Sequence, residues 1–245
     1  MGSAPVLNST EFHVSDRERS GSLYRLKTDR YSSHSVILSY LRDGAGKRLL
    51  DVGAAQGDMA ELLTRQGYDV TAVEGDPGLA EIARTKCNRV VVANLDDPIP
   101  DWGGPFDVVV YGDVLEHLKN PLSVLVNINR QLKPDGVVVI SVPNSAHAWV
   151  RLQMLFGHFD YAERGILDKT HLRFLTLASF RRLLAEAGLE VITLRTTPAP
   201  IPLVVPKRYH GRTLNMTHAL NAAMARAWKT MFAYQFVALA SRSTR

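Results

Sequence analysis

Short apolar segments alternate with stretches of helical period between residues 48 and 142, and few folds are compatible with that alternation. The apolar segments are continuous and rich in valine, which is typical of strands that are covered on both faces. They lie at residues 48–52, 70–73, 89–92, 106–111 and 136–142, and the helical stretches lie at 58–66, 77–84 and 121–132. This order of elements predicts an α/β fold with a doubly wound, mostly parallel sheet.

The pattern changes after residue 143. Residues 145–175 carry aromatic, histidine and charged residues without a clear strand, and a connection of this length predicts a binding element or lid. Prolines at 198, 200, 202 and 206 predict an extended, non-helical stretch. Residues 1–30 are expected to form a flexible arm. The remaining expected elements are helices at 31–41, 177–187 and 214–228 and strands at 189–196 and 233–240.

The composition excludes several classes of protein. The 245 residues include 29 Lys and Arg against 24 Asp and Glu, and 46% are apolar, which is typical of a globular chain. No apolar run reaches the roughly eighteen residues that a membrane span needs. A single cysteine, Cys87, excludes a disulfide framework, and the first residues do not resemble a secretory signal. We therefore expect a cytoplasmic protein.

The charge is unevenly distributed along the chain. Residues 191–245 contain eight basic residues and no acidic one, because the last carboxylate is that of Glu190. Such a basic region can attract phosphates, anionic lipid head groups or nucleic acid, or it can simply be a solvated surface. These alternatives remain open on the sequence alone.

The turn after the first predicted strand has the spacing D-x-G-x-x-x-G, from Asp51 through Gly53 and Ala54 to Gly57. This is not the G-x-G-x-x-G spacing that holds a dinucleotide pyrophosphate. A carboxylate at Asp51 would repel a pyrophosphate but would suit an ammonium group. Glu74 ends the second predicted strand, where an acidic side chain can accept both hydroxyls of a ribose. A ligand with a ribose, an ammonium group and no phosphate describes S-adenosylmethionine.

At these residues the chain resembles the class I S-adenosylmethionine-dependent methyltransferases, over residues 49–194. The resemblance continues at Asn94 and Leu95 after the third strand, at Tyr111-Gly-Asp-Val-Leu-Glu-His-Leu118, and at Ser141-Val-Pro-Asn144. It implies a seven-stranded sheet with the last strand antiparallel, in one domain over residues 31–245 with insertions at about 145–175 and 198–231. It also implies that S-adenosylmethionine is bound and S-adenosylhomocysteine is released. The implied cofactor-binding residues are Asp51, Gly53, Ala54, Gly57, Glu74, Asn94, Leu95 and Tyr111.

The motifs are similar to those of the ubiquinone-biosynthesis subgroup and of small bacterial enzymes that methylate glycans and secondary metabolites. The segment Asp168-Lys-Thr-His-Leu-Arg-Phe-Leu-Thr176 resembles an element of the latter group. The leading interpretation is O-methylation of a small molecule, a sugar or a glycolipid. The alternatives are an RNA ribose 2′-O-methyltransferase that uses magnesium, and a cofactor-binding partner without activity.

Transfer to an alcohol benefits from a base, and histidine titrates in the right range. We expect His171 to be this base, with Asp168 orienting it and His117 at the acceptor pocket. Structural alternatives are open for each: a hydrogen bond that fixes the lid for His171, and a helix-start contact for His117. Four further histidines, His13, His34, His210 and His218, are expected at the surface.

Asp113, Glu116, His117 and His171 together resemble the magnesium-binding set of enzymes that methylate the terminal ribose of small RNAs. Oxygen-rich ligation would suit that ion. The ubiquinone subgroup shares the Glu-His pair, so the set does not choose between the two. We expect a small-molecule or glycolipid acceptor rather than nucleic acid, because no aromatic and basic RNA-binding pattern is present. The apolar and basic C-terminal region could also contact a membrane surface.

Overall fold

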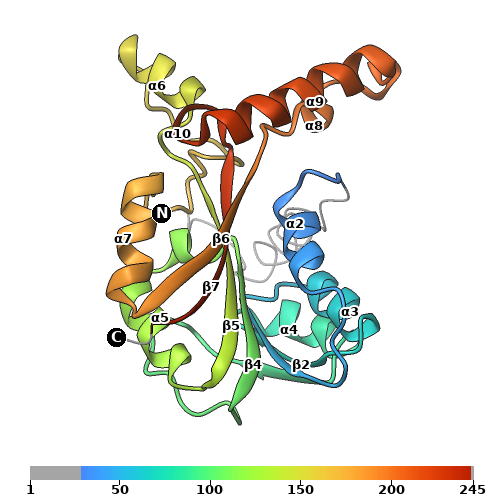
Figure 1. The fold of residues 1–245 in the computed structure, drawn as a ribbon, viewed down its shortest axis with the longest axis vertical. Helices are drawn as coiled ribbons and strands as arrows, with labels where there is room; N and C mark the ends of the chain where they lie inside the picture. The colour runs from blue at the N-terminus through green and yellow to red at the C-terminus, as the bar shows by residue number, and fades with distance from the viewer. Residues whose placement is uncertain (1–28, 244–245) are drawn as a thin grey trace, which may run out of the picture.

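A computed structural model describes residues 29–243 (Figure 1). Its centre is a seven-stranded sheet in the order β3-β2-β1-β4-β5-β7-β6. The strands β1 to β5 are paired in parallel, and β7 is antiparallel to both β5 and β6. The predicted fold class, including the antiparallel last strand, is therefore confirmed. The predicted arm lies outside the described residues except for Asp29 and Arg30.

The strands are β1 (Arg48–Val52), β2 (Asp69–Glu74), β3 (Arg89–Val92), β4 (Phe106–Gly112), β5 (Leu132–Pro143), β6 (Leu189–Thr197) and β7 (Gln235–Arg242). The α-helices are α2 (Ser33–Tyr40), α3 (Asp58–Arg65), α4 (Pro77–Ala83), α5 (Pro121–Asn129), α6 (Ala148–Leu155), α7 (Leu177–Glu186), α8 (Ile201–Val204), α9 (Arg212–Ala227) and α10 (Lys229–Phe232). The described residues also contain two short 3₁₀ turns, η1 (Leu115–His117) and η2 (Lys207–Tyr209).

Local signals explain where several helices begin. The Asp76 carboxylate accepts hydrogen bonds from the N–H groups of Gly78 and Leu79, and Pro77 occupies the first turn of α4. A reciprocal pair of hydrogen bonds between Thr176 and Ser179 starts α7. These caps satisfy N–H groups that a helix cannot pair internally, which is why the boundaries of these helices are visible in the sequence.

Each central strand contributes to two cores, one on each face of the sheet. Leu50 of β1 packs with the cluster that includes Phe180 and Leu125, on the side of α5 and α7. Its neighbour Leu49 packs with the cluster that includes Ile37 and Leu63, on the side of α2 and α3. Successive side chains of a strand point to opposite faces, so a strand buried on both faces must be apolar throughout. The continuous Val-rich runs in the sequence reflect this arrangement.

We call α6, α8, α9 and α10 together the cap, because they lie beyond one end of the sheet (Figure 1). Asn144 after β5 donates a hydrogen bond from Nδ2 to the carbonyl of Ala233, at 2.8 Å. Thr196 near the end of β6 donates to the carbonyl of Ala225 in α9, at 3.0 Å. Because β5 ends at this edge of the sheet, the cap lies at the carboxyl end of the parallel strands, where ligands bind in open α/β sheets.

The cap contains one helix, α6, that the sequence pattern does not predict, and it differs from the sequence expectations at two points. Residues 145–175 contain the helix α6, and the proline-rich stretch contains the helix α8. Pro202 is tolerated in the first turn of α8 because the N–H that proline lacks would have no partner there. His218 is not a surface residue: it is 5% exposed, and its Nε2 lies 2.8 Å from the carboxylate of Asp29.

Candidate active site

The turn between β1 and α3 brings the backbone unusually close to the segment after β4. Gly53 has a φ of +71°, and a Cβ built on it would lie 2.6 Å from Cγ2 of Val114. Only glycine combines that dihedral with that distance, so no other residue fits here without a shift. The N–H groups of Gly53 and Ala54 both donate to the carbonyl of Val73, at 2.8 and 3.0 Å. Gly57 follows with a φ of +76° and starts α3.

Asp51 carries a buried carboxylate at this turn. The side chain is 3% exposed, and its Oδ2 has no hydrogen-bond partner among the described residues. Burial and, to a smaller extent, the negative charge of Glu74 together raise the pKa of Asp51 to about 7. A buried carboxylate with an unpaired oxygen is costly unless a cation or a donor meets it. The residue therefore fits the ammonium group of an amino-acid moiety.

Glu74 lies beside Asp51 at the end of the neighbouring strand β2. Its Oε2 accepts a hydrogen bond from the N–H of Ala55 at 2.7 Å, and its Oε1 accepts one from the N–H of Asp76 at 2.8 Å. These two bonds fix the carboxylate while each oxygen keeps a lone pair for a further donor. Such a carboxylate can accept the two hydroxyls of a ribose, so the pair of acidic residues fits the predicted cofactor.

Of the other predicted cofactor residues, Asn94 and Leu95 lie near Glu74, whereas the side chain of Tyr111 is buried in the core. Asn94 and Leu95 follow β3. The N–H of Ala93 donates to the carbonyl of Glu74 at 3.0 Å, so Asn94 and Leu95 lie near Glu74. Tyr111 points into the core instead and is fully buried. Its hydroxyl has no hydrogen-bond partner among the described residues, and burial raises its pKa well above 10. Only the backbone of Tyr111 is left for a cofactor contact, because its side chain is buried in the core cluster that contains Phe180 and Leu125.

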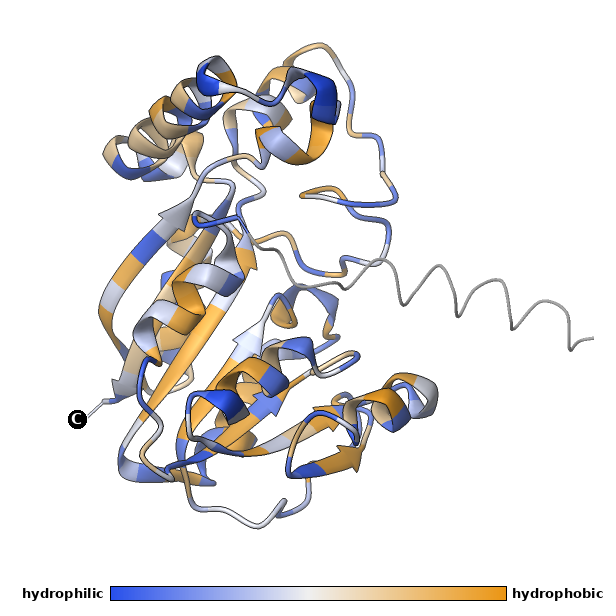
Figure 2. Ribbon diagram, turned by 90° about the vertical axis from the view of Figure 1, so that its right-hand side faces the viewer, coloured by the Kyte–Doolittle hydropathy of each residue, from blue (hydrophilic) through white to orange (hydrophobic). Residues whose placement is uncertain are grey.

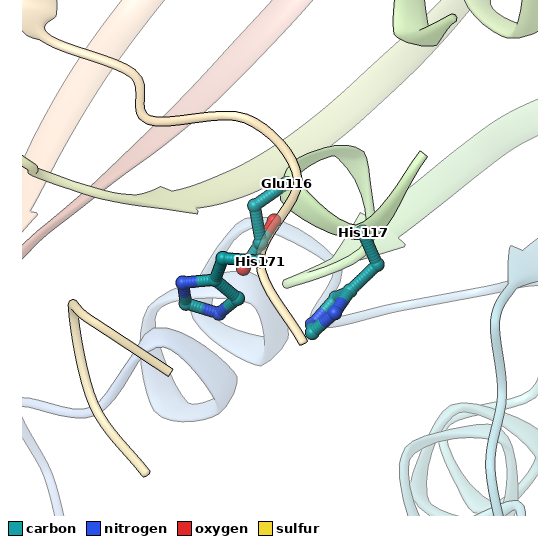
Figure 3. A group of neighbouring side chains, drawn as sticks. All are labelled: Glu116, His117 and His171. Atoms are coloured by element: carbon teal, nitrogen blue, oxygen red, sulfur yellow. The ribbon is translucent and has the colours of Figure 1, made fainter. Parts of the chain in front are cut away.

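Three of the predicted catalytic and metal-binding residues meet at η1 (Figure 3). One ligand-type atom from each of Glu116, His117 and His171 lies within 4.8 Å of the others. The centroids of the two imidazole rings are 4.8 Å apart. The carbonyl of Glu116 accepts the N–H groups of Leu172 and Arg173, at 2.8 and 2.9 Å. These two bonds hold the segment of His171 against η1, across more than fifty residues of sequence.

His171 has a defined tautomer. Its Nδ1 lies 3.0 Å from the carbonyl oxygen of Ile166, which can only accept, so Nδ1 carries the proton. Burial lowers the pKa of His171, and the hydrogen bond to Ile166 raises it by a smaller amount. The imidazole is therefore neutral near pH 7, and within residues 29–243 no donor occupies the lone pair of Nε2. That nitrogen can accept a proton from a hydroxyl or bind a metal ion.

Asp168 is linked to His117 through its side chain and to His171 through its backbone, since its carbonyl accepts the N–H of His171 at 3.0 Å. Its Oδ1 accepts both the N–H and the hydroxyl of Thr170, at 2.9 and 2.7 Å. Nδ1 of His117 lies 3.2 Å from the hydroxyl oxygen of Thr170 and 3.2 Å from the Thr170 carbonyl. Since that hydroxyl donates to Asp168, it accepts from His117. The structure thus adds a chain from His117 through Thr170 to the Asp168 carboxylate, while the charge of Asp168 partly offsets the lowering of the pKa of His171 by burial, without a side-chain hydrogen bond to its ring.

Asp113 lies outside the group formed by Glu116, His117 and His171. Its Oδ2 accepts hydrogen bonds from Nε2 of Gln235 at 2.8 Å and from Oγ of Ser33 at 3.3 Å. Ser141 completes this cluster and donates to Oδ1. Asp113 therefore joins α2, β5 and β7 at the floor of the site and is not placed with the three candidate ligands. Ser33 and Gln235 carried no signal in the sequence, because their roles depend on the arrangement of strands.

Aromatic residues of the irregular segment gather next to His171. The rings of Phe159 and Phe174 have centroids 5.5 Å apart, and Tyr161 lies 6.2 Å from Phe174. Phe174 is in turn 6.5 Å from the ring of His171. Arg173, by contrast, donates to the carbonyl of Lys119 and does not pair with Asp168. The aromatic cluster gives an apolar wall on one side of the candidate base.

Comparisons with known proteins agree with this geometry. A family model described as a methyltransferase domain matches residues 24–194. The ubiquinone biosynthesis O-methyltransferase of Xanthomonas axonopodis pv. citri (strain 306) is 27% identical over 209 residues, which cover 78% of this chain and 87% of that protein. The protein of the same name from Rickettsia akari (strain Hartford) is 27% identical over 183 residues, with 71% and 72% covered.

Solved structures share the fold at lower identity. One is the 1,6-didemethyltoxoflavin-N1-methyltransferase of Burkholderia thailandensis with S-adenosylhomocysteine bound. It superimposes with a TM-score of 0.59 at 19% identity, over 99% of this chain and 93% of that chain. Another is a TehB-like methyltransferase of Corynebacterium glutamicum, with a TM-score of 0.54 at 19% identity, over 96% and 98% of the two chains.

Proposed function

This chain belongs to the methyltransferase-domain family and is an S-adenosylmethionine-dependent methyltransferase, and we propose that it methylates a hydroxyl oxygen of a small molecule, a sugar or a glycolipid. The observation that carries this proposal is the hydrogen bond from Nδ1 of the buried His171 to the carbonyl of Ile166, which leaves Nε2 without a hydrogen-bond partner among the described residues. A hydroxyl acceptor loses a proton as its oxygen is methylated, and a neutral imidazole is suited to accept it.

The cofactor, when bound, supplies an electrophilic methyl group on a sulfonium. We assign the ammonium group to the carboxylate of Asp51 and the ribose hydroxyls to Glu74, with Asn94 and Leu95 near the adenine. His171 then accepts the hydroxyl proton at Nε2, and the aromatic cluster of Phe159, Tyr161 and Phe174 contacts the apolar part of the acceptor. Most of the rate effect would come from alignment of the acceptor oxygen with the methyl group.

The relatives named for ubiquinone biosynthesis support an oxygen acceptor. Their identity of 27% leaves the compound itself open, so a broad assay is the appropriate first test. We would incubate the purified protein with host extract and S-adenosylmethionine carrying a radiolabelled methyl group, and then fractionate the products by solvent and by nuclease digestion. Label in a nuclease-resistant fraction supports the proposal, and label that disappears on nuclease treatment refutes it.

A second candidate function is methylation of an RNA ribose with magnesium. The observation that favours it is the grouping of Glu116, His117 and His171 within 4.8 Å. One carboxylate and two imidazoles can hold a divalent cation when water completes the coordination shell. The same extract assay, repeated with a chelator, distinguishes the two: nuclease-sensitive label that also requires the metal supports RNA, and chelator-resistant label in a small compound supports the first proposal.

A further inference from the structure

The helix α9 has a covered face and, on its opposite side, an exposed apolar stripe. Its inner face is formed by His218, Ala222 and Ala225, which are buried. The opposite side presents Met216 and Leu220, which are 65% and 63% exposed and lie one turn apart. A helix of a globular protein normally turns its polar side outward. The outer stripe of α9 is therefore an apolar surface without an internal partner.

The other cap helices also carry exposed apolar side chains. On α8, Leu203 and Val204 are 71% and 78% exposed. On and just after α6, Trp149, Leu155 and Phe156 are each at least 60% exposed. Figure 2 shows apolar turns at the outer end of the molecule, separated by strongly polar ones. Several large exposed apolar side chains on the helices of one end of a molecule indicate an interaction surface.

The charges of the cap are of one sign. From η2 to α10 the chain has five basic residues and no acidic one, namely Lys207, Arg208, Arg212, Arg226 and Lys229. Arg151 adds a further cation on α6. Among the described residues, none of these six side chains is in an ion pair. The acidic residues that follow α6, Asp160 and Glu163, lie instead beside His158 and Lys169.

We propose that the outer surface of the cap binds an anionic lipid bilayer. Exposed leucine, methionine and tryptophan between basic side chains is the composition of helices that lie in a membrane interface. A second copy of this chain is a poorer occupant, since a symmetric contact would place two basic surfaces against each other. No helix within residues 29–243 is long and apolar enough to cross a bilayer, so the contact would be at the surface.

The cap lies at the same end of the sheet as the candidate active site, so a membrane bound to it would be close to that site. Asn144, which holds α10 through Ala233, follows directly on the carboxyl end of β5, and Gln235 at the start of β7 contacts Asp113 in the candidate site. A bilayer bound to the cap would therefore face the same end of the sheet as His171. An amphipathic acceptor could then reach the site without leaving the membrane. The bilayer contact itself needs neither cofactor nor acceptor, so it can be tested apart from the proposed function.

The test is co-sedimentation of the full chain with vesicles of equal parts phosphatidylglycerol and phosphatidylcholine at low salt. We expect the wild-type chain to bind, and binding to fall at least tenfold in the double variant Met216→Ser/Leu220→Ser. The matched control is Ile82→Ser on α4, a residue that is 43% exposed at a distance from the cap in sequence and in Figure 1. The control should bind like the wild type.

The charge contribution has its own pair of variants. Arg212→Glu on α9 should weaken binding at least fivefold, because a cation close to an anionic surface contributes roughly a factor of five. Arg181→Glu on α7 should leave it unchanged. Absence of wild-type binding, or equal losses in the test and control variants, would overturn the proposal. A dimer in light scattering that Met216→Ser/Leu220→Ser converts to monomer would also overturn it in favour of a second copy.

Discussion

Replacement of Asp51 by asparagine should stabilise the protein without cofactor and, at the same time, weaken cofactor binding. In the folded state the pKa of Asp51 is raised from 3.8 to about 7 by burial and by the charge of Glu74. Between these values the folded chain keeps a proton that the unfolded chain releases. Rising pH therefore favours unfolding, and the full cost is reached above pH 7. A shift of about three units at roughly 1.4 kcal/mol each gives up to about 4 kcal/mol.

We expect Asp51→Asn to raise the free energy of unfolding at pH 8 by up to about this amount, and to change it little near pH 4. Urea unfolding at both pH values measures it directly. Asp107→Asn on β4 is the matched control with the opposite sign. Burial raises the pKa of Asp107, but hydrogen bonds from Lys133 and from the N–H of Arg48 outweigh this and lower it overall. That variant should lose stability at pH 8.

Cofactor affinity should follow the ionisation of the same carboxylate. With a pKa of about 7, roughly a tenth of Asp51 is ionised at pH 6 and about three quarters at pH 7.5. If only the ionised form binds the ammonium group, S-adenosylhomocysteine should bind about eightfold more tightly at the higher pH. Calorimetric titration of wild type and Asp51→Asn would show it. An unchanged pH slope in the variant, for both stability and affinity, would refute the reasoning.

Three further outcomes are expected. Glu74→Ala should weaken binding of S-adenosylhomocysteine about a hundredfold by calorimetry, since two charge-assisted hydrogen bonds are lost, and an unchanged affinity would remove the ribose assignment. His171→Ala should leave that affinity intact but slow methyl transfer by about 10² or more, because the base is lost. The rate of the wild type should fall only when the pH is below the lowered pKa of His171. Normal turnover of the variant would leave His171 with a structural role. Gly53→Ala should lower the melting temperature more than Gly188→Ala, because both have positive φ but only Gly53 would meet Val114; equal losses would contradict the packing argument.

The sheet could be predicted because each strand carries its own evidence. A strand buried on both faces has to be apolar at every position, and capping residues such as Asp76 and Thr176 identify the helix starts. The positions of the two acidic residues proposed for the cofactor could be predicted for the same reason, since Asp51 and Glu74 stand at the ends of such strands. The local sequence pattern was sufficient to place a residue wherever that placement depends only on its position within one strand or helix.

The contacts between distant segments could not be predicted in the same way. His218 lies in a basic tail by sequence, and only the packing of α9 against residue 29 buries it beside Asp29. The connection from His117 through Thr170 to Asp168 depends on two backbone hydrogen bonds to Glu116. Spacing in the sequence cannot show such pairs, because they arise when the irregular segment folds back on η1.

The antiparallel placement of β7 has an evolutionary consequence. Thr197 at the end of β6 pairs with Gln235 at the start of β7, so the chain leaves the sheet and returns to it at neighbouring positions. The segment between them is closed by a two-strand hairpin, and the entropic cost of closing a loop grows only slowly with its length. This segment can therefore lengthen, shorten or be exchanged while β1 and β2 keep Asp51 and Glu74 in place. Enzymes that share this sheet could therefore come to accept different substrates, or to bind different surfaces, by replacement of this one segment between β6 and β7.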